Sequence, residues 1–517
     1  MHELELKLVM DAATARQVWP RALAAGLAAT EPPQRLLAST YFDTDSQPLR
    51  KAGISIRLRR DGRRILQTVK ARASIHGGIS RATELESELA RPELDLSVIA
   101  ATAMRKLIRK LAGDAALKPL VVTEVRRAEA EVRHPCGTRA LMAVDEALIT
   151  AAGKREAFCE LEIEHIDGPL EGLFAIADEV LPPGRMRVSD MSKADRGFLL
   201  AETGQVHPAA APRPACKVKL QRDMSAGSAL QEILRECTGQ IAANIEAVLA
   251  LDAPEGPHQL RVGLRRLRST LALFGTVASC EVAGRLKAEA RWLALEAGHL
   301  RDLQVIVAEI VPEHAGTHSS HPGFGLLIGA AGRAAEGARA RLRQTLEGTR
   351  VRAFLIDLMR FTECRAWEVS EPPGATGDGA RTPVGVLAAA ALGNRWRKVR
   401  KTARRIDVLS VDERHALRKE LKKLRYATEF FAPLFPGRQV KPFLASLRLL
   451  QDLFGELSDA AMLETRLAEL EKGMPPDPDV RFAAGLLIGS AVARADVHWH
   501  EARALWKALR QQRLFWK

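Results

Sequence analysis

The sequence predicts an α+β protein of several domains, in which a strand-rich N-terminal part precedes an all-helical C-terminal part. Residues 1–203 alternate apolar and charged side chains over short segments, which is the period of a β-strand. From about residue 229 onward, apolar residues recur with helical spacing. Residues 204–216, rich in Pro and Ala, separate the two patterns and predict a linker. A chain of 517 residues has room for two or more domains.

Seven segments of the N-terminal part show the alternation expected of strands. They are Glu3–Val9, Ile54–Arg59, Ile65–Lys70, Glu84–Leu89, Leu120–Val125, Ala140–Val144 and Cys159–Ile166. Helical spacing interrupts them most clearly at Leu94–Leu111 and Pro169–Val180, where we expect helices.

Several of these strands gather charged side chains on one face. Glu3, Glu5 and Lys7 share a face of the first segment, and the three carboxylates of Glu160–Glu164 share a face of the last. A solvated sheet face would explain any single case. Carboxylate pairs on several strands repel unless a cation lies between them. We therefore expect a barrel with charged faces inside, holding a polyanion and a metal; oxygen ligands favour Mg²⁺ or Mn²⁺.

The positive charge is distributed unevenly along the chain. Residues 1–203 hold 30 basic and 29 acidic side chains, whereas the remaining residues hold 47 and 34. A basic domain indicates an anionic partner such as nucleic acid, an anionic membrane or polyphosphate, although charge that serves only solubility would look the same. Aromatic residues make up only 5%, which argues against nucleic acid held by base stacking.

The remaining composition points to the cytoplasm. The six cysteines include no C-x-x-C pair, as expected for free thiols in a reducing compartment. The first residues are too charged for a signal peptide, and no apolar run approaches the roughly 18 residues of a membrane span. We expect a cytoplasmic protein without a membrane partner.

A motif of basic residues occurs twice in the helical part. His258–Arg268 and His415–Arg425 share the pattern H-x-L-R-x-x-L-[RK]-[RK]-L-R. In each copy an aspartate, Asp302 or Asp459, follows 44 residues after the histidine. The repeat predicts two related helical bundles, about residues 217–370 and 384–510, divided by the Gly- and Pro-rich segment 371–383.

Each copy of the motif places four basic residues on one helix face, because they are spaced three, four and three apart. They are His258, Arg261, Arg265 and Arg268, and then His415, Arg418, Lys422 and Arg425. Stacked like charges destabilise a helix, so their recurrence predicts a bound anion. Neutralisation by neighbouring carboxylates, with Asp302 and Asp459 as candidates, is the alternative. The basic segment Arg395–Arg405 would extend the same surface.

The N-terminal part resembles the CYTH domains, which are triphosphate tunnel metalloenzymes. The matching motifs occur in order over residues 1–200. They are Glu3-x-Glu5-x-Lys7, Tyr41-Phe-Asp-Thr44, Arg57-x-Arg59, Thr68-Val-Lys70, Arg81 with Glu84-x-Glu86, Arg127, Asp145, Glu160-x-Glu162-x-Glu164, and Ser192-Lys193 with Arg196-Gly197. The resemblance implies an eight-stranded antiparallel β-barrel with flanking helices, enclosing a tunnel in which a divalent metal supports hydrolysis or cyclisation of triphosphates.

The resemblance also assigns roles to individual residues. The implied metal ligands are Glu3, Glu5, Glu160 and Glu162. The implied substrate-binding residues are Lys7, Arg57, Arg59, Lys70, Arg127 and Lys193. The implied catalytic residues are Glu3, Glu5, Lys7 and Asp145. Three choices stay open, since strand register decides them: Arg126 or Arg127, Glu84 with Glu86 or Glu86 with Glu88, and Glu160 or Glu164.

The helical part, over about residues 217–510, resembles the CHAD domain, a helical domain often found directly behind CYTH. The resemblance implies two bundles related by an approximate twofold axis, and binding of inorganic polyphosphate by the eight basic residues of the repeated motif.

Together these features predict an inorganic triphosphatase that cleaves tripolyphosphate to pyrophosphate and phosphate by direct attack of water, while its helical domain binds polyphosphate. One alternative is a nucleoside or thiamine triphosphatase, or an adenylate cyclase, that uses the same tunnel. Another is a non-catalytic protein that binds or targets polyphosphate.

Overall fold

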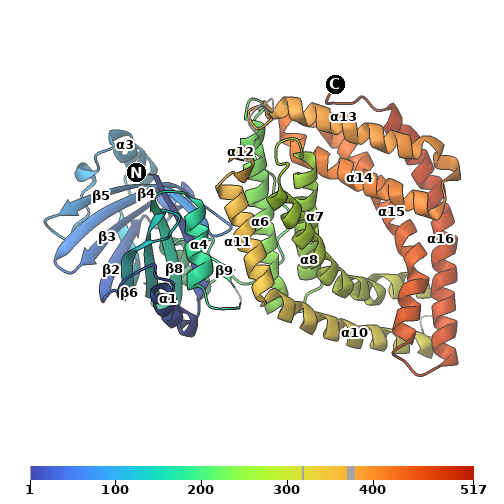
Figure 1. The fold of residues 1–517 in the computed structure, drawn as a ribbon, viewed down its shortest axis with the longest axis horizontal. Helices are drawn as coiled ribbons and strands as arrows, with labels where there is room; N and C mark the ends of the chain where they lie inside the picture. Colours follow the sequence, from blue (N-terminus) through green and yellow to red (C-terminus); the bar gives the residue numbers. More distant parts are fainter. Residues whose placement is uncertain (1, 185, 317–319, 370–378) are drawn as a thin grey trace. The chain divides into compact units, whose positions relative to one another are not determined.

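The computed structural model describes the chain except residues 1, 185, 317–319 and 370–378, and except the side chains of residues 2, 3, 72–74, 314 and 369. Most of the expected divider at 371–383 therefore lies outside the described residues. The chain forms two compact units (Figure 1). One comprises residues 1–211 with 347–360, and the other residues 212–346 with 361–517.

The first unit is a closed antiparallel β-barrel of eight strands, as predicted. Along the sheet the order is β5-β4-β3-β2-β6-β7-β8-β1, and a further pairing of β1 with β5 closes it. The strands are β1 (His2–Met10), β2 (Gln34–Asp43), β3 (Ser55–Asp61), β4 (Arg64–His76), β5 (Ile79–Leu89), β6 (Lys118–Arg133), β7 (Arg139–Ala151) and β8 (Lys154–Asp167). A short strand, β9 (Arg187–Val188), pairs with β1 outside this ring.

Helices cover the apolar outer faces of the strands. Helices α1 (Ala12–Ala24) and α4 (Glu171–Val180) contact β8. Behind them Leu161 and Ile163 of β8 are fully buried, whereas the alternating residues of that strand are carboxylates. Helices α2 (Pro48–Lys51) and α3 (Thr102–Ala112) belong to a second apolar cluster, formed with β3 and β4. Burial of these faces forces the charged faces inward.

The predicted helix Leu94–Leu111 is wrong in its first part. The chain forms a 3-10 turn, η1 (Leu96–Val98), before α3 begins at Thr102. Ile99 and Ala101 have extended backbone angles, so they separate the two helices although the apolar spacing continues across them. The other predicted helix is present as α4.

Helix α5 (Lys193–Thr203) fills one end of the barrel lumen. Its Phe198 and Leu200 pack in one cluster with Tyr41, Val125 and other apolar side chains from the inner faces of β2, β6, β7 and β8. A capping box between Ser192 and Asp195 fixes the start of this helix. The lumen is therefore apolar around α5 and charged beyond the N-terminus of the helix.

The second unit is all-helical, as predicted (Figure 1). Helix α7 packs between α6 and α8, while α14 packs between α13 and α15, and α7 also contacts α14. The two copies of the basic motif therefore lie on helices that touch. Among the described residues, no helix has the length and apolar character needed to cross a membrane.

The helices from residue 226 onward are α6 (Ala226–Ala250), α7 (Glu255–Leu273), α8 (Glu281–Val305), η2 (Ile306–Ile310), α9 (Val311–Ala315), α10 (Pro322–Leu346), α11 (Thr349–Glu363), α12 (Ala366–Val369), α13 (Val384–Thr402), η4 (Ala403–Val408), α14 (Val411–Phe431), η5 (Ala432–Leu434), α15 (Gly437–Glu471) and α16 (Pro478–Gln511).

Candidate functional site

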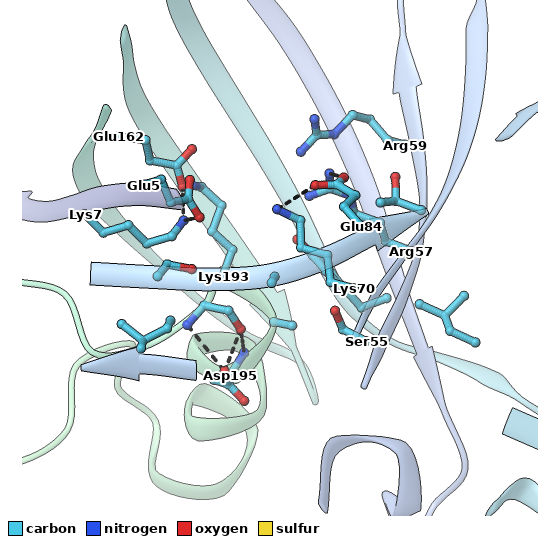
Figure 2. Close-up of a pocket in the computed structure, with 18 of the residues that line it drawn as sticks. Glu5, Lys7, Ser55, Arg57, Arg59, Lys70, Glu84, Glu162, Lys193 and Asp195 are labelled. Carbon is cyan, nitrogen blue, oxygen red and sulfur yellow. Dashed lines mark hydrogen bonds and ion pairs between the residues drawn. The ribbon is translucent and has the colours of Figure 1, made fainter. Parts of the chain in front are cut away.

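The charged part of the barrel lumen is a cavity of about 770 Å³. Most of the residues predicted for the tunnel line it. They are Glu5, Lys7, Arg57, Arg59, Lys70, Arg127, Glu162 and Lys193. Figure 2 shows two groups of them at opposite sides: one around Glu162 and Lys7, the other around Arg57 and Lys70. The side chain of Glu3 lies outside the described residues, although its backbone belongs to β1.

On the first side, a lysine joins two carboxylates. The Nζ atom of Lys7 lies 2.8 Å from Glu5 and 2.5 Å from Glu162. The register explains this contact, since Lys7 is directly opposite Glu162 in the pairing of β1 with β8. Burial opposes the charge on Lys7, but Glu162 and Glu5 outweigh it and raise the lysine pKa well above its usual value. Lys7 therefore stays charged in the cavity.

Asp145 and Glu160 are fully buried and do not line the cavity. The Nζ atom of Lys193 binds both of them, at 2.8 and 2.9 Å, and also Glu162 at 2.8 Å. Arg127 binds Asp145 through two nitrogens, each at 2.7 Å. Burial opposes ionisation of Asp145, yet Lys193 and Arg127 lower its pKa. These two carboxylates thus hold the cations that face the cavity.

The opposite side of the cavity is mainly cationic. Arg57 and Lys70 contact Glu84 at 3.4 and 2.9 Å, so one carboxylate serves two cations. Burial, and then repulsion by Arg57, lower the pKa of Arg59 to about 10. Burial opposes ionisation of Tyr41, yet Arg57 and then Arg59 lower the pKa of its phenol. A shortage of negative charge on this side suits an anionic ligand.

Two carboxylates that line the cavity, those of Glu5 and Glu164, could bind a cation. Glu5 lies directly opposite Glu164 in the pairing of β1 with β8, and like charges at such positions repel. Burial, and then Glu5, raise the pKa of Glu164. Both residues line the cavity, whereas Glu160, the alternative to Glu164 in the sequence prediction, does not. The register thereby places Glu162 and Glu164 in the cavity and Glu160 behind it.

These residues fit a divalent metal of the hard, oxygen-binding kind. Among the described side chains, no group of three or more His, Cys, Asp or Glu is arranged to hold a metal ion. Mg²⁺ needs fewer protein ligands than that, since it is commonly held by one or two carboxylates together with waters and phosphate oxygens. Glu5 and Glu164 supply such a pair, and Glu3 follows the same face of β1.

The remaining register choices are visible in the barrel. Arg127 points inward, whereas Arg126 is exposed. Glu84 and Glu86 line the cavity, whereas Glu88 does not and pairs with Arg64.

Sequence reasoning gave no site role to several of the residues that line the cavity, and two of these are ionisable groups beside predicted site residues. They are Tyr41 and Glu129. Glu129 follows Arg127 by two positions on β6, and this alternation was a signal that could have placed it on the inner face.

Substitutions of Glu164 and Glu160 should have different effects, because only Glu164 lines the cavity. We expect Glu164→Gln to raise the metal concentration needed for half-maximal activity by about 10- to 100-fold. Glu160→Gln should raise this concentration less, since its carboxylate binds Lys193 and does not line the cavity. Metal titrations of phosphate release from tripolyphosphate measure both. An unchanged requirement in Glu164→Gln with a raised one in Glu160→Gln would restore Glu160 as the ligand.

The second predicted site lies on α7 and α14 of the helical unit. Arg261 binds Asp302 at 3.1 Å, and Arg466 from α15 binds the other oxygen of the same aspartate at 3.3 Å. Asp302 therefore neutralises part of the basic face, as the alternative prediction proposed, but it serves two arginines. Asp459 lies 3.8 Å from Arg466.

The other members of the two basic faces have mostly neutral partners. Arg265 donates to the hydroxyl of Tyr426 at 2.5 Å, and Arg418 donates to Ser458 at 2.8 Å. Arg425 instead pairs with Glu429 at 3.2 Å. Burial, and then Arg291, lower the pKa of Arg268. For His258 and His415 the pKa is lowered by burial, and by nearby cations that include an arginine or lysine of the same helix.

Lys422 shows that the two basic faces act on each other. Burial, and then Arg418, Arg265 and Arg261, lower its pKa to about 7. Two of these arginines belong to α7 and one to α14. The contact between α7 and α14 thus joins both copies of the motif in one region of positive potential. We call this region, which contains Arg261, Arg265, Arg418 and Lys422, the groove. An anion bound there would relieve the repulsion between these cations.

Comparisons with known proteins match both halves of the chain. The CYTH domain family matches residues 1–198, and the CHAD domain family matches residues 232–468. The crystal structure of the CHAD domain from the plant Ricinus communis is 27% identical, with a TM-score of 0.51; the match covers 59% of this chain and 98% of that one. A candidate adenylyl cyclase from Hippeastrum, described as having a dominant triphosphatase activity, is 20% identical over 40% of this chain and 98% of its own, with a TM-score of 0.29.

Proposed function

Since this chain belongs to the proteins that join a CYTH domain to a CHAD domain, we propose that it is an inorganic triphosphatase whose helical domain binds inorganic polyphosphate. CYTH domains are metal-dependent triphosphate tunnel enzymes. We propose in addition that the substrate of this one is inorganic triphosphate and that the ligand of the helical domain is inorganic polyphosphate. The functional parts would be residues 1–203 and 217–510, joined by the linker 204–216.

One observation carries the proposal for the barrel: one cavity has carboxylates together with lysines on one side and mainly cations on the other. Arg57, Arg59 and Lys70 would bind the oxygens of one phosphate group and stabilise the charge that develops on it. Lys7 and Lys193 would orient the phosphates nearer the carboxylates. Tripolyphosphate consists of phosphate groups alone, so these cations and the metal would be sufficient to bind it.

The metal would be held by Glu5 and Glu164, with Glu162 on the same side of the cavity and with Glu3 as the further ligand that the sequence predicts. When bound, Mg²⁺ or Mn²⁺ supplies charge neutralisation and lowers the pKa of a bound water. Asp145 and Glu160 would act as positioning residues, because each holds Lys193 without reaching the cavity. The attack is by water, and no covalent phosphoenzyme is part of the proposal.

A substrate panel tests this function. Phosphate release is measured from tripolyphosphate, ATP, thiamine triphosphate and long polyphosphate, each with Mg²⁺, Mn²⁺ or EDTA. We expect metal-dependent release mainly from tripolyphosphate. Faster release from ATP or thiamine triphosphate, or formation of cyclic AMP, would replace the inorganic substrate. No release from any of the four, together with tight binding of long polyphosphate, would leave only the binding function.

Binding of polyphosphate in the groove should weaken as pH rises above 7. Lys422 has a pKa of about 7 in the free protein, and a bound polyanion raises it toward or beyond the usual 10.5. The contribution is complete below the free pKa and disappears as pH rises through the bound one, by at most about tenfold per pH unit. Titration calorimetry at pH 6.5, 7.5 and 8.5 measures the affinity.

The control variants for this effect are on the same helix. Lys422→Met should remove the fall in affinity above pH 7, whereas Lys419→Met, at an exposed position, should keep it. His258 and His415 have lowered pKa values and titrate below this window. Equal pH profiles for the wild type and Lys422→Met would contradict the assignment.

A further inference from the structure

The excess positive charge of the helical part lies outside the groove. Residues 394–405 contain seven Lys or Arg, residues 502–517 contain five, and neither segment contains Asp or Glu. Residues 204–517 hold 47 basic and 34 acidic side chains. Without these twelve cations, 35 basic residues stand against 34 acidic ones, so the rest of the helical part is nearly neutral. We call these two segments together the outer basic face.

The two segments of the outer basic face are side by side. Trp396 of α13 packs against Trp506 of α16 with ring centroids 5.5 Å apart, and against Trp516 at 6.4 Å. Asp407, just after the first segment, accepts contacts from Arg503 at 3.5 Å and Lys507 at 3.7 Å. The apolar sides of both segments are thus packed together, and their cations share one surface.

Most cations of this surface are exposed and lack an acidic partner. Lys398 and Lys401 are three residues apart on one face of α13, Arg405 follows in η4 after the end of that helix, and all three are exposed. Among the described residues, none of the seven cations of residues 394–405 forms an ion pair. Like charges on one helix face destabilise it by a few tenths of a kcal/mol per pair. A surface built in this way is complementary to an extended polyanion.

We propose that the outer basic face is a second binding site for inorganic polyphosphate, which holds a part of a long chain that the groove does not. The inference rests on the polyphosphate-binding function proposed above. A chain long enough to reach both sites would bind more tightly than a short one, because the second contact is intramolecular. The outer basic face would therefore set the preference for chain length.

The chemistry of the surface favours polyphosphate over the other polyanions. Trp396, Trp506 and Trp516 are all less than 8% exposed, so none of them offers a platform for a nucleic-acid base. A helix that binds a membrane surface inserts an apolar face. The apolar face of α13, which includes Leu392 and Val399, is instead buried within the unit. Recognition here is by charge alone, and polyphosphate presents charge alone.

The test compares two variants of the full chain that remove the same charges. The first combines Lys398→Gln, Lys401→Gln and Arg405→Gln on the outer basic face. The matched control combines Lys106→Gln, Lys110→Gln and Arg109→Gln on α3, where the three residues are also exposed. A third variant, Arg261→Gln with Lys422→Gln, weakens the groove. Binding to chains of about 100 and about ten phosphates is measured over a range of salt concentrations.

We expect the outer variant to weaken binding of the long chain by roughly tenfold and to lower the salt slope by about two. Binding of the short chain and hydrolysis of tripolyphosphate should match the control. Loss of long-chain binding only in the groove variant would overturn the inference and leave the proposed function intact. Absence of polyphosphate binding by the wild type would overturn both.

Two further arms distinguish the source of the phosphate groups. Duplex DNA and vesicles of phosphatidylcholine with phosphatidylserine are offered to the same proteins. If the outer variant loses affinity for either of these but keeps it for the long polyphosphate chain, the surface serves that other partner and the inference is wrong.

Discussion

Replacing Glu5 by Gln is expected to reduce metal-dependent hydrolysis of tripolyphosphate by about 100-fold or more. The carboxylate of Glu5 faces Glu164 across the β1–β8 pairing and contacts Lys7 at 2.8 Å. The substitution keeps the size of the side chain but removes the charge that a metal requires. Loss of residues that merely support a metal ligand costs 10- to 100-fold, so loss of a ligand should cost at least as much. Phosphate release at saturating Mg²⁺ measures the effect.

The matched control for this variant is Glu124→Gln on the outer, exposed face of β6. Both variants remove one carboxylate from a barrel strand, so a difference in activity between them reports on the position of the charge. Thermal unfolding with and without metal gives a second readout: added Mg²⁺ should stabilise the wild type and Glu124→Gln but not Glu5→Gln. Activity of Glu5→Gln within threefold or so of the control would contradict the assignment.

Replacing Lys193 by Met is expected to destabilise the barrel by about 3–5 kcal/mol. Lys193 is the cation shared by Asp145, Glu160 and Glu162, at 2.8, 2.9 and 2.8 Å. After its removal Asp145 keeps Arg127 and Glu162 keeps Lys7, but among the described residues Glu160 keeps only Arg196, at 3.8 Å. A fully buried carboxylate with so distant a partner is costly. Hydrogen exchange of the amides of β7 and β8 measures the local free energy of unfolding.

A double variant separates this charge effect from a packing effect. Lys193→Met combined with Glu160→Gln removes the carboxylate that the single variant leaves without a close partner. The double variant should therefore be more stable than Lys193→Met alone, although each substitution by itself is destabilising. Additive losses would mean that Lys193 stabilises the barrel through its aliphatic chain and not through Glu160.

The alternation of apolar and charged residues predicted where most strands lie, but not how long they are. The seven segments recognised as strands all coincide with β-strands, except that Ile54 lies one residue before β3. Most of these strands are longer than the segments; Ala140–Val144 belongs to β7, which runs from Arg139 to Ala151. The remaining strand, β2 (Gln34–Asp43), and the helix α1 were not among the segments named. Part of the inner face is apolar because α5 packs against it, so alternation of charge fades there. The tertiary position of α5 could not be read from local spacing.

For the site in the barrel, the sequence likewise predicted which residues share a strand face but not how they are arranged in the cavity. A period of two assigns Glu160, Glu162 and Glu164 to one face of β8, and all three do share that face. Their depth depends instead on the register with β1, which sets Glu162 opposite Lys7 and Glu164 opposite Glu5. Their surroundings depend on α5, which brings Lys193 against Glu160. Neither is encoded in the strand itself, and for that reason the sequence alone left the choice between Glu160 and Glu164 open.

The repeated basic motif of the helical part was easier to interpret from the sequence than the site in the barrel. The spacing of His258–Arg268 fixes which side chains share a helix face, and two copies 157 residues apart indicated one function. The spacing could not show that α7 and α14 touch, and hence that Arg261 and Arg265 depress the pKa of Lys422. It also could not show that Asp302 serves two arginines.

Closure of the barrel through β1 has a consequence for how the protein is made. Glu5 lies opposite Ser80 of β5 and opposite Glu164 of β8, so the first strand synthesised completes its pairing only after one of the last. Such non-local pairing is slow, because a long loop must be ordered before any contact rewards it. Until β8 has left the ribosome, the nascent chain exposes open strand edges on which other chains can add. This domain should therefore depend on chaperones during translation more than the helical domain, where most helices pack against the next helix in sequence.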